Sequence, residues 1–230
     1  ASTDPAGATG GLTWATSTFT FDGTTGNRIS KVTVMDDGST MTRDFGDGTT
    51  DTLLTQTTTN IPGAQDTSTI TFDSAGRWDS LEITFDAGGS MLSTRYDYDD
   101  AGRLDTLTQT QTNDVVATSQ YNDLNQRTSL TYTDAQNAIG GWETSTLTFD
   151  PATGELVTKE VLGDAGNTSV DTYSSGVIQQ RVTTDTNANV AWATITTNFT
   201  VTGSFDSVYH EYDNGTGIVQ GSAIDNTLTG

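Results

Sequence analysis

Ser68-Thr69-Ile70-Thr71-Phe72-Asp73 is the stretch that decides the fold, because near-copies of it occur elsewhere in the chain. Ser17–Asp22 reads Ser-Thr-Phe-Thr-Phe-Asp, and Ser145–Asp150 reads Ser-Thr-Leu-Thr-Phe-Asp. Each copy alternates hydroxyl and apolar residues, which is the period-two pattern of a half-buried β-strand. Each copy then runs through Phe-Asp into a turn with a glycine, so the repeated unit is predicted to be a β-hairpin.

The aromatic residue of this motif returns at intervals of 23 to 28 residues. The series is Phe21, Phe45, Phe72, Tyr98, Tyr121, Phe149, Tyr173 and Phe199. Such a period indicates supersecondary units that bury apolar surface only against their neighbours. We predict an all-β chain, a tandem array of about eight β-hairpin repeats of ~25 residues that forms an elongated, solenoid-like or spiralling sheet. Two of the copies, at Phe21 and Phe149, have one extra turn residue, and a longer or bulged connection is expected there.

The recurring rings allow two interpretations. As structural residues they would form a ladder of stacked rings inside the sheet, together with Trp14, Trp142 and Trp192, which stand seven residues before three of the aromatics. Alternatively, the three tryptophans would form a platform for a polysaccharide. The aspartate after most of the rings is expected to accept backbone N–H groups of its own turn.

Composition limits the partners. The net charge of -21 and the pI near 4.1 argue against nucleic acid or an anionic membrane as a partner, since such binding depends on Lys and Arg. No apolar run is long enough to insert into a membrane. The chain is expected to contain a Gly/Ala-rich extension over residues 1–13, the repeats over 14–219 and a tail over 220–230. The extension is a candidate donor of a strand to a neighbouring subunit.

Tyr98-Asp99-Asp100-Ala101-Gly102-Arg103 carries a resemblance to a known family. Phe72–Arg77 and Tyr121–Arg127 are close variants of the same Tyr/Phe-Asp-x-x-Gly-Arg core. The motif resembles the tyrosine-aspartate (YD) repeat of Rhs-type bacterial surface and toxin-carrier proteins, over roughly Trp14 to Val219. This resemblance implies an extracellular, secreted or cell-surface protein whose hairpins join laterally into a long spiralling sheet.

Calcium is the one candidate ligand ion. The segments Asp97–Gly102 and Asp44–Asp51 gather hard oxygen ligands around glycine turns, as calcium loops do, without completing an EF-hand. The candidate ligands are Asp44, Asp47, Asp51, Asp97, Asp99 and Asp100. No phosphate-cradling loop, metalloprotease helix or dinucleotide fingerprint is present. We therefore expect no enzymatic activity, no catalytic residues and no other cofactor.

Two further interpretations concern polar residues. His210 is the only histidine and is expected at a partly buried strand position, because it aligns with Ile83. Thr-x-Thr pairs such as Thr69-x-Thr71 invite an ice-binding interpretation, but they flank inward-facing apolar residues and recur at uneven intervals.

These observations favour a non-enzymatic extracellular structural protein, which self-assembles as a filament subunit or forms the stalk of a surface adhesin. The repeats lack a catalytic constellation, the charge is strongly negative, and the ends do not look like capping units, so exposed strand edges would add neighbours. The alternatives are a calcium- or carbohydrate-binding surface module and a fragment of a toxin-enclosing repeat shell.

Overall fold

The computed structural model describes residues 2–3, 14–61, 63, 65–186 and 192–221. As predicted, this part of the chain is all-β: it contains antiparallel strands in open sheet structure and no helix. The chain divides into two compact units, Ala1–Thr112 and Asn113–Gly230, and each is described by itself.

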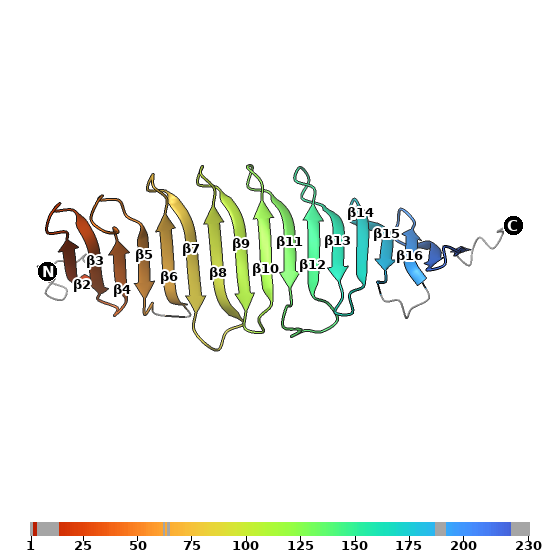
Figure 1. Ribbon diagram of the computed structural model, residues 1–230, viewed down its shortest axis with the longest axis horizontal. Helices are drawn as coiled ribbons and strands as arrows, with labels where there is room; N and C mark the ends of the chain where they lie inside the picture. The colour runs from red at the N-terminus through yellow and green to blue at the C-terminus, as the bar shows by residue number, and fades with distance from the viewer. Residues whose placement is uncertain (1, 4–13, 62, 64, 187–191, 222–230) are drawn as a thin grey trace. The chain divides into compact units, whose positions relative to one another are not determined.

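The first unit is a meander of antiparallel strands in which each strand pairs with its neighbours in sequence (Figure 1). The strands are β1 (Ser2–Thr3), β2 (Trp14–Phe21), β3 (Arg28–Met35), β4 (Thr40–Asp44), β5 (Thr55–Thr59), β6 (Gln65–Phe72), β7 (Trp78–Phe85), β8 (Met91–Tyr98) and β9 (Leu104–Gln111).

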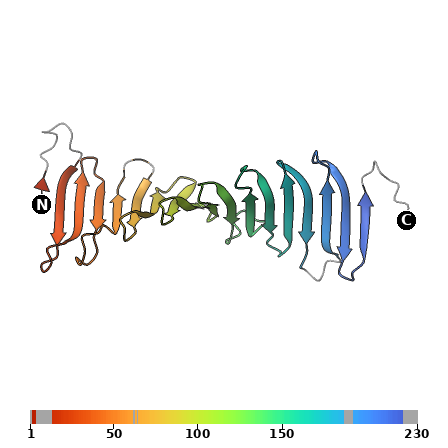
Figure 2. The ribbon, with the colours of Figure 1, turned by 90° about the horizontal axis from the view of Figure 1, so that it is seen from above.

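The second unit repeats this arrangement, again with antiparallel registers between strands that follow each other along the chain (Figure 2). Its strands are β10 (Val116–Tyr121), β11 (Arg127–Thr133), β12 (Thr144–Phe149), β13 (Leu156–Leu162), β14 (Thr168–Ser174), β15 (Val177–Thr184), β16 (Trp192–Phe199), β17 (Phe205–Tyr212) and β18 (Gly217–Gly221).

Each unit is a single layer of strands, so both faces of its sheet are in contact with solvent. Residues opposite in register share a face, and so do alternate residues along a strand. One face, which we call the aromatic face, contains the recurring rings; across the first unit one of its rows is Phe19, Lys31, Arg43, Gln56, Ile70, Leu81, Tyr96 and Leu107. The adjoining row on the other face, the hydroxyl face, is Thr18, Val32, Thr42, Thr57, Thr69, Glu82, Arg95 and Thr108.

The second unit has the same two faces. A row of its aromatic face is Ser119, Leu130, Leu147, Lys159, Asp171, Arg181, Thr197, Val208 and Gln220. Threonines oppose each other on the hydroxyl face, and Oγ1 of Thr131 lies 3.2 Å from Oγ1 of Thr146. In the first unit Thr67 and Thr84 make the same contact at 2.7 Å. Paired β-branched side chains of this kind stabilise a sheet without adding apolar surface.

Apolar burial is sparse because no second layer covers either face. Among the described residues only Phe45, Val115 and Ala117 are buried apolar side chains. The other buried side chains are polar, such as those of Ser80 and Asp134. Stability must therefore come mainly from strand pairing, cross-strand contacts and ordered turns.

A β-bulge accompanies the aromatic in seven hairpins. In the first of them Thr20 opposes Ser30 but Phe21 opposes Arg28, so Ile29 is the extra residue on the second strand. The same shift occurs immediately before Phe72, Tyr98, Tyr121, Phe149, Tyr173 and Phe199. The longer turns expected at Phe21 and Phe149 are present, but the bulge is a general feature of the hairpins and not peculiar to those two. In six of the seven hairpins it brings the ring opposite the first residue of the returning strand, whereas Tyr173 opposes Ile178, the second residue of β15.

The ends of the chain are only partly described. In the first unit β1 pairs with β2 through Ser2 opposite Ser17 and Thr3 opposite Thr16. The rest of the expected N-terminal extension, residues 1 and 4–13, lies outside the described residues, and so do residues 222–230 of the expected tail. Residues 220 and 221 belong to β18.

Candidate functional site

The turns after the aromatics are held by a recurring side-chain clamp. Oδ1 of Asp73 accepts the backbone N–H groups of Ala75 and Arg77 at 2.8 and 2.9 Å, while Oδ2 accepts Nε of Arg77 at 2.8 Å. Asp99 accepts the same three donors from Ala101 and Arg103, each within 2.9 Å. The expected turn-capping role of the aspartate is confirmed, and the arginine of the motif completes the clamp.

The clamp also exists in a neutral form. Oδ1 of Asn122 accepts the backbone N–H groups of Leu124 and Gln126 at 3.0 Å, and its Nδ2 donates to Oε1 of Gln126 at 3.0 Å. Gln126 therefore takes the place of the motif arginine. Arg127, the arginine that the sequence motif aligned with it, is instead the first residue of β11 and opposes Tyr121.

These contacts shift the acidity of the turn aspartates. The backbone N–H of Arg77 is the main reason that the pKa of Asp73 is lowered, and the guanidinium hydrogen bond lowers it further. Donors from Arg103 lower the pKa of Asp99 in the same way. Each carboxylate is therefore held in its charged form by hydrogen bonds that favour that form.

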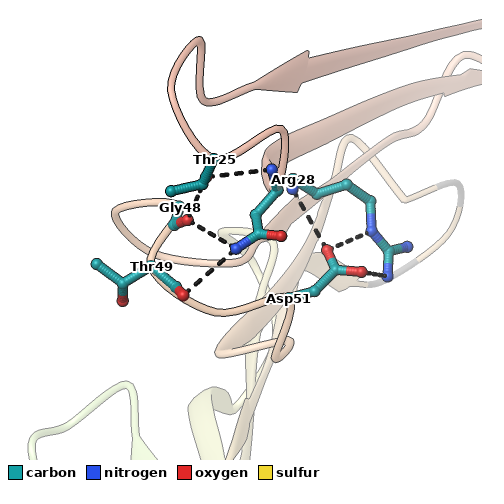
Figure 3. Close-up of polar contacts among 6 residues, drawn as sticks. Thr25, Arg28, Gly48, Thr49 and Asp51 are labelled. Atoms are coloured by element: carbon teal, nitrogen blue, oxygen red, sulfur yellow. Dashed lines mark hydrogen bonds and ion pairs between the residues drawn. The ribbon is translucent and has the colours of Figure 1, made fainter.

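A different cluster occupies the aromatic face at the start of the first unit. The guanidinium of Arg28 lies over the ring of Phe45, with Cζ 4.5 Å from the centroid, and forms a two-pronged ion pair with Asp51. Nε contacts Oδ1 and Nη2 contacts Oδ2, both at 2.7 Å (Figure 3). The hydrogen bond from Arg28 lowers the pKa of Asp51, and the pKa of Arg28 is raised by the same bond. Phe45 is only 5% exposed, and the guanidinium of Arg28 covers one face of its ring.

The loop between β4 and β5 is positioned by the turn between β2 and β3. Thr25 Oγ1 and Asn27 Nδ2 donate to the carbonyl oxygen of Gly48 at 2.8 and 3.0 Å (Figure 3). A Cβ on Gly48 would stand 2.6 Å from Cβ of Asp22, and Gly48 has φ of +80°. This close approach requires glycine, and it brings the loop that contains Asp51 against Arg28.

The second unit also has an arginine stacked on a ring, but no long loop follows that ring. Cζ of Arg127 lies 4.4 Å from the ring centroid of Phe149. Next to this stack is a hollow of about 500 Å³, whose lining residues are Tyr121, Gln126, Arg127, Phe149, Pro151, Ala152, Thr153 and Gly154. A cation and rings beside a hollow of this size can bind a small group that has both negative charge and apolar surface.

The recurring rings are less enclosed than a stacked ladder requires. Phe45 is buried and Phe21 is 55% exposed, while Phe72, Tyr98, Tyr121, Phe149, Tyr173 and Phe199 are half-buried. The ring pairs found among the described residues are Phe19 with Phe21 and Trp78 with Tyr98. Within a unit, rings of successive hairpins are two strands apart, roughly 9.5 Å. Arg28, Trp78 and Leu156 oppose Phe21, Phe72 and Phe149 on the strand between.

The three tryptophans occupy different places. Trp14 begins β2 in the first unit, Trp142 precedes β12 and Trp192 begins β16 in the second unit. Strands β12 and β16 are four strand intervals apart, roughly 19 Å. Trp142 and Trp192 therefore do not meet as one platform.

The calcium candidates lie in turns or, for Asp44 and Asp97, in the last two residues of a strand, and most of their carboxylates already have partners. Asp44 and Asp47 accept backbone N–H groups of Gly46 and Thr49 at 2.9 Å. Asp51, Asp97 and Asp99 pair with Arg28, Arg95 and Arg103, and the backbone carbonyl of Asp100 accepts from Arg77. No group of three or more His, Asp or Glu residues in the described part of the chain is arranged to hold a metal ion.

The sequence interpretation placed His210 correctly and missed the Arg127 cluster. His210 is half-buried on β17, opposite Ile195, as expected for a strand position. Arg28 and Arg127 were not recognised as equivalent because their turns differ in length by one residue. Counting back from the returning strand would have aligned them, since each is the first residue of its strand.

Comparison with known proteins does not identify the chain. The sequence matches no protein-family model and no curated protein. Among solved structures, a porin-like protein from Bacteroides uniformis is similar at 16% identity and a TM-score of 0.22, over 83% of this chain and 89% of that chain. At this TM-score the similarity supports no conclusion about function. The described residues include no helix long and apolar enough to cross a membrane.

Proposed function

We propose that this protein is a non-enzymatic, extracellular structural protein of bacterial type, which self-assembles as a filament subunit or forms the stalk of a surface adhesin. The observation that carries the proposal is the single-layer meander. Its strands gain partners only sideways, so a sheet of this kind is extended by adding further strands. No catalytic role is assigned to any residue.

The terminal strands support lateral growth. All registers of β18 are with β17, and Ile218 and Val219 are about half exposed on opposite faces of the strand. At the other end, β1 pairs with only two residues of β2. A short, apolar, glycine-flanked strand is a suitable acceptor for the edge of a second copy.

The finer architecture belongs to the same proposal. We infer about eight YD-like hairpin repeats of ~25 residues that continue as a spiralling, solenoid-like sheet. Support comes from the clamp, the bulge and the glycine turn, which recur in both units. Small-angle X-ray scattering of the full chain tests this form, and a compact scattering profile would contradict it.

Size-exclusion chromatography with light scattering, followed by negative-stain microscopy, tests assembly. We expect the full chain to form polymers and Val219→Lys to shorten them, because a lysine on an edge strand opposes pairing. Val201→Lys is the matched control, since Val201 is exposed in a turn. Deleting residues 1–13 tests strand donation separately, and polymers unchanged by that deletion would exclude it. A chain that stays monomeric at all concentrations would refute the assembly proposal.

Two other functions remain as alternatives to be separated by experiment. The cationic and aromatic side chains of the aromatic face, such as Lys31 over the exposed ring of Phe19, favour a carbohydrate-binding surface module. A glycan array and calcium calorimetry test this class of function. The third candidate, part of a toxin-enclosing shell, predicts a natural reading frame that extends well beyond Gly230.

A further inference from the structure

The two arginine–ring stacks are equivalent positions of the fold. Arg28 begins β3, opposes Phe21 on the preceding strand and lies over Phe45 of the following segment. Arg127 begins β11, opposes Tyr121 on the preceding strand and lies over Phe149 at the end of the next strand. The two Cζ-to-centroid distances, 4.5 and 4.4 Å, are nearly identical.

The two positions differ in what lies against the guanidinium. In the first unit the connection after Phe45 runs to Leu54 and supplies Asp51. In the second unit the turn after Phe149 is shorter, and the carboxylate of Asp150 is used by the backbone N–H groups of Ala152 and Thr153. Among the described residues, no carboxylate forms an ion pair with Arg127, which is exposed.

The residue before each arginine is an amide that can donate a further hydrogen bond. Asn27, the residue before Arg28, donates to the backbone carbonyls of Gly48 and Thr49 in the loop that contains Asp51. Gln126, the residue before Arg127, lines the hollow. Its Oε1 accepts from Asn122, so its Nε2 is the atom that can donate to an incoming carbonyl.

We propose that the hollow at Arg127 is a binding site for an aspartate-bearing peptide turn of another protein chain. The incoming carboxylate pairs with the guanidinium of Arg127 as Asp51 pairs with that of Arg28. An apolar side chain of the incoming turn covers Phe149, and one of its backbone carbonyls accepts a hydrogen bond from Gln126. A peptide is favoured over an acidic sugar because the occupied copy of the site is filled by peptide, whose backbone carbonyls make half of the contacts that the neighbouring turn provides. This site does not depend on polymer formation.

The probe is the chain's own loop as a synthetic peptide, residues 45–54, with acetylated and amidated ends. A head-to-tail cyclised version reduces the cost of ordering the peptide. The peptides are titrated into the full isotope-labelled protein, and the backbone amide resonances of Thr153 and Gly154, which line the hollow and remain in every variant, are followed by NMR. We expect a saturable shift, lost with Arg127→Ala and weakened about tenfold or more with Arg127→Lys, because lysine lacks the planar fork.

Matched peptides and a matched protein variant test the assignment. An Asp51→Asn peptide is expected to bind about 10-fold to 100-fold more weakly, whereas an Asp47→Asn peptide binds unchanged. Arg43→Ala removes another arginine of the aromatic face and leaves binding intact. The proposal is overturned if neither the linear nor the cyclised peptide of residues 45–54 gives a saturable shift at about 10 mM. It is also overturned if binding survives Arg127→Ala, or if an oligouronate binds through Arg127 where these two peptides do not.

Discussion

Nδ2 of Asn122 donates a 3.0 Å hydrogen bond to Oε1 of Gln126, at the two positions where other hairpins have an aspartate and an arginine. One turn geometry is thus held by a neutral pair in one hairpin and by an ion pair in others. Both forms have a side-chain Oδ1 atom that accepts two backbone N–H groups of the turn, and this atom is the shared requirement. The ion pair is an additional contact that only the charged form has.

Converting the neutral clamp into the charged one should therefore change stability little. We expect Asn122→Asp with Gln126→Arg to alter the free energy of unfolding by less than about 1 kcal/mol, since exposed ion pairs contribute little. Chemical denaturation of the double and single variants in low and high salt measures this effect. A gain that persists in high salt would mean that the charged clamp acts by more than a screened ion pair.

Phe45 and Phe21 occupy the same position in the repeat, but they should differ sharply in their contribution to stability. Phe45→Ala removes a buried ring and the surface on which Arg28 lies, and we expect a loss of about 3–5 kcal/mol. Phe21→Ala removes a ring that is mostly exposed and should cost about 1 kcal/mol or less. Thermal and denaturant unfolding of the two variants makes the comparison, and equal losses would show that burial does not decide the effect.

The ion pair between Asp171 and Arg181 is expected to couple β14 to β15. Asp171 is 5% exposed, and its carboxylate accepts from the guanidinium of Arg181 at 2.6 and 2.8 Å. Arg181→Ala leaves that carboxylate buried without its main partner, so we expect a loss of about 1–3 kcal/mol. A double-mutant cycle with Asp171→Thr measures the coupling. Arg43→Ala is the control, because Arg43 bonds a neutral glutamine.

Acid should destabilise the fold through the turn aspartates. The pKa values of Asp51, Asp73 and Asp99 are lowered in the folded chain by their arginine and backbone donors. Their stabilisation is therefore complete above the unfolded pKa of about 3.9 and is lost as pH falls through the lower folded values. Melting temperatures between pH 7 and pH 2 report this loss. Asp73→Asn with Asp99→Asn should flatten the profile, and an unaltered acid transition in that variant would exclude these turns as its origin.

Calcium binding is expected to require displacement of arginines. Because Asp51 and Asp99 already pair with Arg28 and Arg103, we expect calcium at about 1 mM to leave the melting temperature unchanged. Calorimetry and thermal unfolding with and without a chelator give the measurement. A calcium-dependent rise that Asp97→Asn abolishes would favour the ligand-binding alternative.

Local patterns in the sequence predicted antiparallel hairpins and their turns, but not the long connection that follows Phe45. Alternation around Phe72 and the Phe-Asp-glycine order predicted hairpins, and the side-chain acceptor of Asp73 followed from turn chemistry. The bulge could be expected only where the turn contained an extra residue. Its occurrence at Tyr98 and Tyr173 depends on register, which local alternation does not specify.

What the sequence did not reveal is how little the rings are covered. A ladder of rings in an interior presumes a second layer over the sheet, and composition alone does not distinguish one layer from two. Phe45 is buried and has Arg28 over its ring, whereas Phe21 is 55% exposed. The Arg127 hollow was missed for a related reason, since the turn after Phe149 is shorter than the connection after Phe45 and the hollow has no motif of its own.

The sequential registers have a consequence for inheritance. Because each strand of a unit is bonded to the strands before and after it, loss or duplication of one whole hairpin in the gene would join two compatible edges and preserve every remaining pairing. Deletion of one residue within a strand would instead exchange the two faces from that point to the next turn. Natural variants of this chain should therefore differ in length by complete hairpins.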